Sequence, residues 1–189
     1  MEVTEILSKV KKNVSKSRYD HTVRVMKTAI KLAEIHNVNQ RQVEIASALH
    51  DYSKCESEDD LKNYIIEHHI DADLLNYNKE LWHSHVGAHY AQYTLGIDDR
   101  SILNAIKYHT TGRENMDQVE LIVFIADFIE PERKIAGIDK IRKMAEQDLH
   151  EAALLIFKAS IPYLVSLEAV VYPGTLDAYN YLIKLKGDH

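Results

Sequence analysis

The sequence contains few of the residues that hold small secreted or turn-rich proteins together. Among 189 residues there are one cysteine, three prolines and six glycines. A single cysteine, Cys55, excludes an internal disulfide and is typical of a protein from a reducing compartment. Because glycine and proline are scarce, few sharp turns are expected, and the composition favours long helices.

The sequence also lacks a long apolar run. No stretch approaches the roughly 20 apolar residues that span a membrane, and the first twenty residues do not resemble a secretory signal. We therefore expect a soluble, cytoplasmic protein with no membrane partner. The formal net charge of −6 argues against nucleic acid as a partner, because proteins that bind long polyanions are usually basic. The negative net charge is still compatible with a small phosphate ligand, because a buried metal site can reverse the local field.

Almost every segment has the periodicity of an α-helix. Apolar residues recur at spacings of three and four, as in the series through Val43 and Ala46. Helix-start signals fit this pattern, because acidic residues follow Ser57, and Asp117 precedes an apolar segment that Pro131 ends. No alternation of apolar and polar residues is long enough for a strand. The sequence predicts an all-α bundle of roughly nine or ten helices.

The expected helix boundaries follow from glycine, proline and capping residues. We expect helices over 80–95 before Gly96, 99–109, 138–147, 149–171 with a bend at Pro162, and a last one capped by Thr175. No repeat or low-complexity linker divides the chain, so a single domain over 1–189 is expected.

Eleven histidines is a high number for this length, and several lie on predicted apolar faces. His50 lies four residues after Ala46 on such a face, and Asp51 follows it directly. Neighbouring side chains on a helix diverge by about 100°. This pair could therefore reach two adjacent metal ions, with Asp51 bridging them. For the dipeptide alone, a buried His–Asp hydrogen bond is the simpler explanation.

Three further residues favour the metal interpretation. His21 shares a helix face with Val25, and His109 continues a face through Ile106. Asp127 stands inside the apolar segment LIVFIADFI, has no adjacent lysine or arginine, and is expected to be buried. Several core-facing histidines and aspartates in one domain are difficult to explain as packing alone. Imidazole and carboxylate ligands suit iron, manganese, zinc or cobalt better than magnesium.

The segment WHSHVGAHY offers three candidates for a further ligand. We favour His83, because Gly87 lies one turn later on the same face and leaves room for a metal or substrate. His85 could line the substrate pocket, or form a separate metal pair with His89, although His89 is more easily explained as structural or exposed. The remaining histidines are expected to be solvated: His36, His68, His69, His150 and His189.

Five blocks occur in an order that resembles the HD superfamily of metal-dependent phosphohydrolases. They are RYDHTVRVMKTAIKLA, IASALHDYSK, ELWHSHVGA, AIKYHTTGR and VFIADFIEPER. More narrowly, these blocks resemble the bacterial YqeK family. The resemblance implies a symmetrical diadenosine tetraphosphate hydrolase that forms two ADP at a di-iron centre. It also implies a metal-binding core over about 18–133, with C-terminal helices over 138–187 packed against it.

The resemblance assigns two metal ions to six ligands. One ion would take His21, His50, Asp51 and Asp127, and the other would take Asp51, His83 and His109. Two divalent ions and two carboxylates leave a charge of about +2, which suits a hydroxide and a phosphate oxygen. Iron is the expected metal, with manganese, cobalt or zinc as alternatives, and Asp51 would be essential for catalysis.

Cationic and hydroxyl residues near these blocks are candidates for contacts with a small nucleotide substrate. Lys54 could hold a phosphate or protonate the leaving oxygen, and the two arginines could make bidentate phosphate contacts. The candidates for substrate binding are Lys54, His85, Thr110, Thr111, Gly112, Arg113 and Arg133.

Three other functions remain open from the residues. One is a different nucleotide phosphohydrolase or phosphodiesterase with the same centre, which the ligands alone cannot separate from the first. A di-iron oxygenase on this scaffold would need a pocket for a neutral polyol. In a non-enzymatic module, the metal would only join helices. The apolar C-terminal helices could also serve a homodimer.

Overall fold

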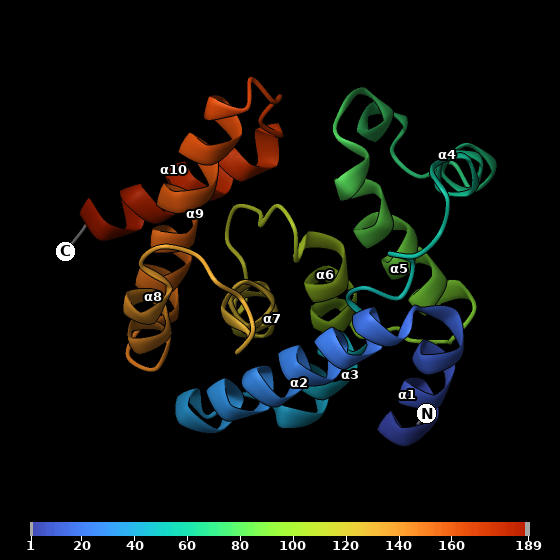
Figure 1. Cartoon of the computed structure of the whole chain (residues 1–189), viewed down its shortest axis with the longest axis horizontal. Coiled ribbons are helices and arrows are strands. Elements are labelled where there is room, and N and C mark those ends of the chain that lie inside the picture. Colours follow the sequence, from blue (N-terminus) through green and yellow to red (C-terminus); the bar gives the residue numbers. More distant parts are fainter. Residues whose placement is uncertain (1, 188–189) are drawn as a thin grey trace.

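The computed structural model describes residues 2–187, which form ten α-helices and two short 3-10 helices, with no strand among them. Figure 1 shows their arrangement. This confirms the prediction of an all-α fold. The helices are α1 (Val3–Asn13), α2 (Lys16–His36), α3 (Gln40–Leu49), α4 (Glu58–Glu67), α5 (Trp82–Tyr93), α6 (Arg100–Tyr108), α7 (Gln118–Ile129), α8 (Ile138–Ala145), α9 (Leu149–Ser166) and α10 (Pro173–Gly187), with η1 (Ala72–Asn76) and η2 (Lys79–Leu81).

The most apolar helix, α7, lies at the centre of the fold. It packs against α2, α3, α6 and α9, so its apolar residues are covered on nearly every side. A capping box begins it: the Asp117 side chain accepts from the backbone N–H of Glu120, and the Glu120 side chain accepts from that of Asp117. Pro131 follows its end and cannot continue the helix, as the sequence predicted.

Two apolar clusters organise the remaining helices. The larger extends from Ile6 in α1 to Leu182 in α10 and includes α2, α3, α6, α7 and α9. In Figure 1, α8, α9 and α10 lie together on one side of α7, and α4 and α5 lie on the other. A smaller cluster beneath α4 and α5 contains Trp82, whose indole N–H donates to the carbonyl of Leu74 at 2.8 Å.

Several boundaries differ from the sequence prediction. Helix α1 was not predicted, and the segment before Trp82 is a 3-10 turn that precedes α5. Helix α9 ends at Ser166 with Pro162 inside it, five residues earlier than expected. Helix α10 begins at Pro173, so Thr175 lies in its first turn and is not its cap. Apolar composition predicted the length of α9 poorly, because its last turn is exposed and its sequence has no glycine to mark the end.

Within the described residues, no helix combines the length and apolar character that crossing a membrane requires.

Candidate metal centre

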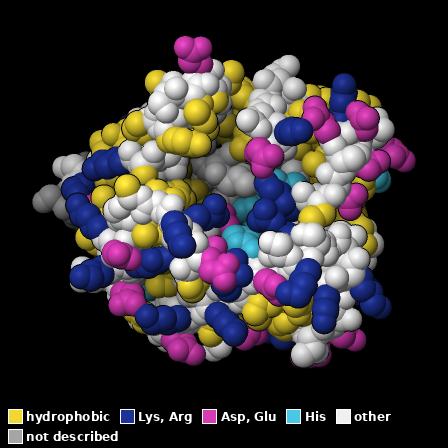
Figure 2. Space-filling model, viewed as in Figure 1, with side chains coloured by type: hydrophobic (Ala, Val, Ile, Leu, Met, Phe, Trp, Pro, Cys, Tyr) yellow, Lys and Arg dark blue, Asp and Glu magenta, His cyan; other side chains and the backbone are white. Residues whose placement is uncertain are grey.

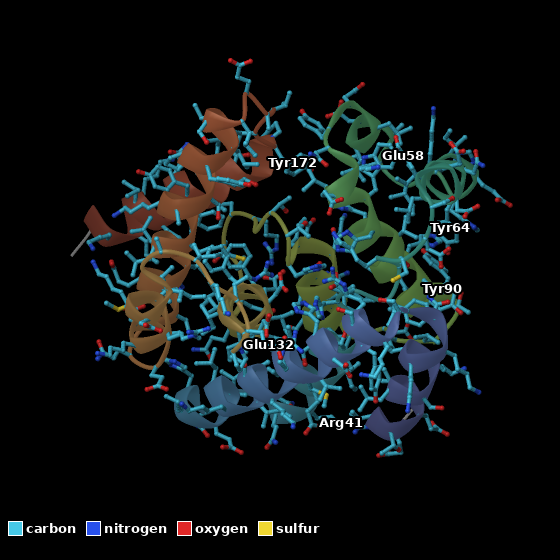
Figure 3. All side chains as sticks on the ribbon, viewed as in Figure 1. Arg41, Glu58, Tyr64, Tyr90, Glu132 and Tyr172 are labelled. Atoms are coloured by element: carbon cyan, nitrogen blue, oxygen red, sulfur yellow. The ribbon has the colours of Figure 1, made fainter. Side chains whose placement is uncertain are left out.

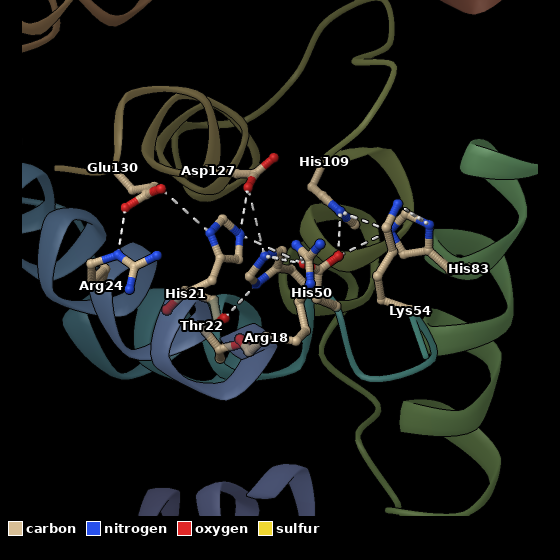
Figure 4. Close-up of polar contacts among 12 residues, drawn as sticks. Arg18, His21, Thr22, Arg24, His50, Lys54, His83, His109, Asp127 and Glu130 are labelled. Carbon is tan, nitrogen blue, oxygen red and sulfur yellow. Dashed lines mark hydrogen bonds and ion pairs between the residues drawn. The ribbon is translucent and has the colours of Figure 1, made fainter. Parts of the chain in front are cut away.

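Five helices or their ends bring the six predicted ligands together (Figure 4). Two ligands lie inside long helices, in the second turn of α2 and near the end of α7, and two lie immediately after α3. The others lie at the start of α5 and immediately after α6. The converging residues are His21, His50, Asp51, His83, His109 and Asp127.

Asp51 lies between two groups of histidines. Its Oδ1 is 3.1 Å from His83 Nε2 and 3.6 Å from His109 Nε2. Its Oδ2 is 3.3 Å from His50 Nε2 and 3.6 Å from His21 Nε2. Each oxygen therefore faces a different pair of imidazoles. The ligand atoms form two groups, each within 4.8 Å, that share Asp51. This arrangement is suited to a carboxylate that bridges two ions.

Asp127 belongs to the group around His21. Its Oδ1 lies 3.0 Å from His21 Nε2 and 3.8 Å from His50 Nε2. The sequence predicted a buried carboxylate without a cationic neighbour, but the side chain is 22% exposed and lies 3.5 Å from Arg133 Nη2. Helix α7 is covered elsewhere, yet at this position it borders a cavity. The sequence did not predict the contact between Asp127 and Arg133, because the two residues are separated in the chain and only the turn at Pro131 brings Arg133 back to the helix.

The histidine tautomers fit a metal centre. His50 Nδ1 lies 2.7 Å from the carbonyl oxygen of Ser47, and His109 Nδ1 lies 2.8 Å from that of Ile106. A carbonyl only accepts, so each Nδ1 carries a proton, and in the neutral ring, the form that binds a metal, each Nε2 presents a lone pair. His50 is fully buried, and its Nε2 has no hydrogen-bond partner among the described residues. A buried acceptor without a donor is costly, and a metal ion would satisfy it.

The electrostatics of the cluster favour charged carboxylates beside a neutral imidazole. Burial opposes ionisation of Asp51, but the field of His50 and the close imidazoles of His109 and His83 hold its pKa well below the ordinary value. Burial also opposes ionisation of Asp127, yet the hydrogen bond with His21 lowers the pKa of that carboxyl. Burial lowers the pKa of His83 to about 4. Carboxylate anions and neutral imidazoles are the forms that bind metals.

Three residues beside the ligands were not predicted from the sequence. Arg18 Nη1 lies 2.7 Å from Asp51 Oδ2, and the buried Glu130 has its Oε1 3.6 Å from His21 Nδ1. Arg24 Nε donates to Glu130 at 2.7 Å and so holds that carboxylate (Figure 4). Of these three residues, only Arg18 could have been found from the sequence spacing, because it precedes His21 by one helical turn. Nothing in the sequence pattern indicated Glu130.

A cavity of about 450 Å³, hereafter the apolar cavity, opens beside the cluster. Its polar lining includes Lys54, Thr110 and Thr111, three of the predicted substrate-binding residues, with His109 and Asp127. The rest is mainly aliphatic and aromatic and comes largely from α7, α9 and the loop before α10. That lining includes Phe124, Phe128, Phe157, Tyr163 and Tyr172. In Figure 3, Tyr172 lies beside the gap that separates α10 from the helices on the opposite side.

Lys54 contacts the cluster and lies at the rim of this cavity. Its Nζ donates to Glu80 at 2.6 Å and lies 3.5 Å from His83 Nδ1.

Gly112 has φ +64, and a Cβ there would lie 2.6 Å from the Phe157 ring. That glycine therefore permits close packing against α9 and does not itself line the cavity.

The structure does not bring Arg113 or His85 to the cluster. The Arg113 guanidinium forms two hydrogen bonds, of 2.8 and 2.7 Å, with the carboxylate of Glu120, which is only 1% exposed. This ion pair occupies the guanidinium group that was predicted to clamp a phosphate. His85 is buried and lines a separate cavity of about 620 Å³ that also contains His68, His69 and His89. His83 and His85 are two positions apart on α5 and so point to nearly opposite sides of the helix, which explains why His83 reaches the cluster and His85 does not.

The other histidines largely match their predicted environments. His68, His69 and His150 are exposed. His36 differs, because its Nε2 lies 2.7 Å from the carbonyl of Ala145 and so contacts α8. His89 is half-buried and contacts Tyr64 through Nδ1. His189 lies outside the described residues.

The all-helical fold and the histidine–aspartate pair, His50 and Asp51, at the centre of the metal-ligand cluster together indicate the family to which the chain belongs. Residues 18–132 match the HD domain family, and the chain belongs to this family. The matched segment contains all six candidate ligands at the cluster and ends in the turn that follows α7. The sequence-based identification of an HD protein is therefore confirmed.

Similar proteins show which members of the HD domain family this chain resembles. The chain is 41% identical to the symmetrical bis(5'-nucleosyl)-tetraphosphatase of Bacillus subtilis, over 95% of this chain and 96% of that protein. It is 40% identical to the protein of the same name from Halalkalibacterium halodurans, over 94% and 95%. A crystal structure of a predicted HD superfamily hydrolase involved in NAD metabolism, from Clostridium acetobutylicum, has a TM-score of 0.92, is 34% identical and covers 98% of both chains. These likenesses extend over the C-terminal helices and confirm the resemblance to the YqeK-type proteins.

Proposed function

We propose that this chain is a metal-dependent hydrolase that cleaves diadenosine tetraphosphate at its central anhydride and releases two ADP. The observation that carries the proposal is the shared position of Asp51 between two groups of buried ligands, beside a cavity with an aromatic lining. The near-full-length identity to symmetrical tetraphosphatases supports the same substrate. A nucleoside base would enter the apolar cavity, because flat aromatic side chains are suited to its faces.

Two divalent transition-metal ions fit the ligand set. His21, His50, Asp51 and Asp127 would hold one ion, and Asp51, His83 and His109 would hold the other. Nitrogen and carboxylate ligands are compatible with iron, manganese, cobalt or zinc, and iron is our first expectation. Such ions supply Lewis acidity, which polarises phosphoryl oxygens and makes a water nucleophile available near neutral pH.

The residues around the ions would position the substrate and move one proton. Water adds to one central phosphorus, the bond from that phosphorus to the bridging oxygen breaks, and the oxygen leaves with the second ADP. Lys54, beside His83 and at the rim of the apolar cavity, is placed to donate a hydrogen bond or a proton to that leaving oxygen. Thr110 and Thr111 would add hydroxyl donors to the phosphate chain.

Chromatography of the products tests this function. With diadenosine tetraphosphate as substrate, the purified protein should release ADP as the sole nucleotide product. Release of ATP and AMP would refute symmetrical cleavage. Failure to cleave this substrate, together with efficient hydrolysis of a mononucleotide, would instead support the alternative of a nucleotidase.

A homodimer stays a prediction from the apolar C-terminal helices. At the end of α9 and in the following loop, several apolar residues are exposed: Tyr163, Val165, Leu167 and Val170. Equilibrium sedimentation over a range of protein concentrations would decide between a monomer and a dimer.

A further inference from the structure

A second cavity, of about 330 Å³, adjoins the cluster at His21. It shares no lining residue with the apolar cavity, but each cavity contains metal-ligand candidates, His21 in one and His109 with Asp127 in the other. The cluster therefore lies between two cavities. In Figure 4, Arg24 and Glu130 lie at one end of the cluster, and Lys54 and His83 lie at the other.

The lining of this second cavity is almost entirely polar and predominantly cationic, and we refer to it as the basic cavity. Among the residues that the structure describes, His21 is the only one with an aromatic ring in this lining. Its lining residues are Ser17, Arg18, His21, Arg24, Glu130, Glu132, Arg133 and Lys134. Figure 2 shows a hollow at the centre of the front face, with histidine at its bottom and lysine, arginine and acidic side chains around it. In a chain of net charge −6, such a concentration of positive charge indicates an anionic ligand.

The two carboxylates of the basic cavity do not neutralise all four cations. Both carboxylates bind Arg24, Glu130 at 2.7 Å and Glu132 at 3.1 Å. In Figure 3, Glu132 lies between α7 and α2. Arg18 and Arg133 contact instead the metal-ligand candidates Asp51 and Asp127.

Arg18 and Arg133 retain the capacity to bind an anion. Arg18 uses one guanidinium nitrogen, Nη1, for Asp51, and Arg133 uses one, Nη2, for the carbonyl and carboxylate oxygens of Asp127. The guanidinium group has five N–H donors, so each arginine can contact a phosphate while keeping its present partner. The side chains are 32% and 39% exposed, which leaves both accessible from the cavity.

From this geometry we infer that the basic cavity is the subsite for the second diphosphate half of the substrate, with Arg18 and Arg133 as its contact residues. The inference rests on the proposed function and assigns the two halves of a dinucleoside tetraphosphate to different surroundings. One nucleoside occupies the apolar cavity, the central phosphates lie at the cluster between the two cavities, and the other diphosphate lies on the arginines. The second nucleoside is then held mainly through its phosphates, because the basic cavity has no aromatic surface for a base.

Calorimetric titration of the metal-loaded protein tests the inference with two ligands. One is a diadenosine tetraphosphate analogue in which a methylene group replaces the central bridging oxygen, and the other is inorganic pyrophosphate. Arg18→Ala and Arg133→Ala should each weaken binding of both ligands by about tenfold, because a charge-assisted hydrogen bond is lost. Tyr172→Ala, in the apolar cavity, should weaken binding of the analogue but leave pyrophosphate binding unchanged. Arg100→Ala, at an exposed position on α6, is the matched control and should alter neither.

Metal analysis accompanies each titration, because Arg18 and Arg133 contact ligand candidates. If Arg18→Ala loses metal, Lys134→Ala replaces it as the test variant, because Lys134 lines the cavity and is expected to contribute about threefold to pyrophosphate binding. Binding within twofold of wild type in fully metal-loaded arginine variants would overturn the inference, and so would wild-type protein that binds neither ligand. Arginine-dependent binding of pyrophosphate without binding of the analogue would keep the anion subsite and reject the dinucleotide substrate.

Discussion

Among single residues, Asp51 has the most contacts with the cluster, because its two oxygens face four histidines and Arg18. Asp51→Asn preserves the shape of the side chain but removes its charge, so a bridging role would be lost. We expect turnover to fall by at least about 100-fold and metal content to decrease. Asp98→Asn, at an exposed loop position, is the matched control. Normal turnover and metal content in Asp51→Asn would show that the residue is no ligand.

Glu130 acts on the cluster through His21 and is a positioning residue. Its buried carboxylate lies 3.6 Å from His21 Nδ1 and is held by Arg24, so we expect it to orient the ring that presents Nε2 to the centre. Glu130→Gln should weaken metal binding by about 10- to 100-fold, as measured by competition with a chelator. The neighbouring Glu132, which is 70% exposed, offers a control, since Glu132→Gln should retain wild-type affinity. Equal affinity in both variants would remove Glu130 from the centre.

At the scale of the element, a capping box begins α7, the helix that carries Asp127. The capping box of Asp117 and Glu120 satisfies backbone N–H groups that would otherwise have no partner. Asp117→Ala should lower the free energy of unfolding by about 1 kcal/mol. Urea denaturation would measure the loss, with Asp177→Ala on the exposed face of α10 as the control. A change no larger than that of the control would mean that the box contributes nothing.

The ion pair between Arg113 and Glu120 links the loop after α6 to α7. Arg113→Ala would leave a buried carboxylate unpaired and should lower the free energy of unfolding by about 2 kcal/mol, a value reduced because the Arg113 side chain is 30% exposed. Burial already raises the pKa of Glu120, so its ionisation costs stability as the pH rises through that pKa. The destabilisation should therefore shrink in acid, where Glu120 is protonated.

Unfolding curves for Arg113→Ala at neutral and acidic pH would test this role. Undiminished stability together with weaker substrate binding would instead restore Arg113 as the phosphate clamp that the sequence predicted. Arg100→Ala is again a suitable control, because it removes an exposed arginine from the adjacent helix.

For the whole molecule, metal binding should contribute substantially to stability, because five helices or their ends carry the candidate ligands. Ions that bind only the folded state at a concentration about 1,000 times Kd stabilise by about 4 kcal/mol. At about 2–4 °C per kcal/mol for a protein of this size, removal should lower Tm by roughly 10 °C. Calorimetry with and without chelator would measure the shift. Asp51→Asn should show little further loss in chelator, and an equal shift in wild type and variant would point to an effect away from this centre.

The sequence by itself determined the helical class, the caps at Ser57 and Asp117, and the identity of the cluster residues. Helical periodicity and local hydrogen bonds depend on neighbours within a few residues, and these are visible in the sequence. Only the tertiary structure decided which charges meet. It paired Arg113 with Glu120, directed His85 away from the cluster, and placed Arg18 and Arg133 beside the metal-ligand candidates. Contacts between residues distant in the chain depend on how whole helices pack, and local pattern carries no record of that packing.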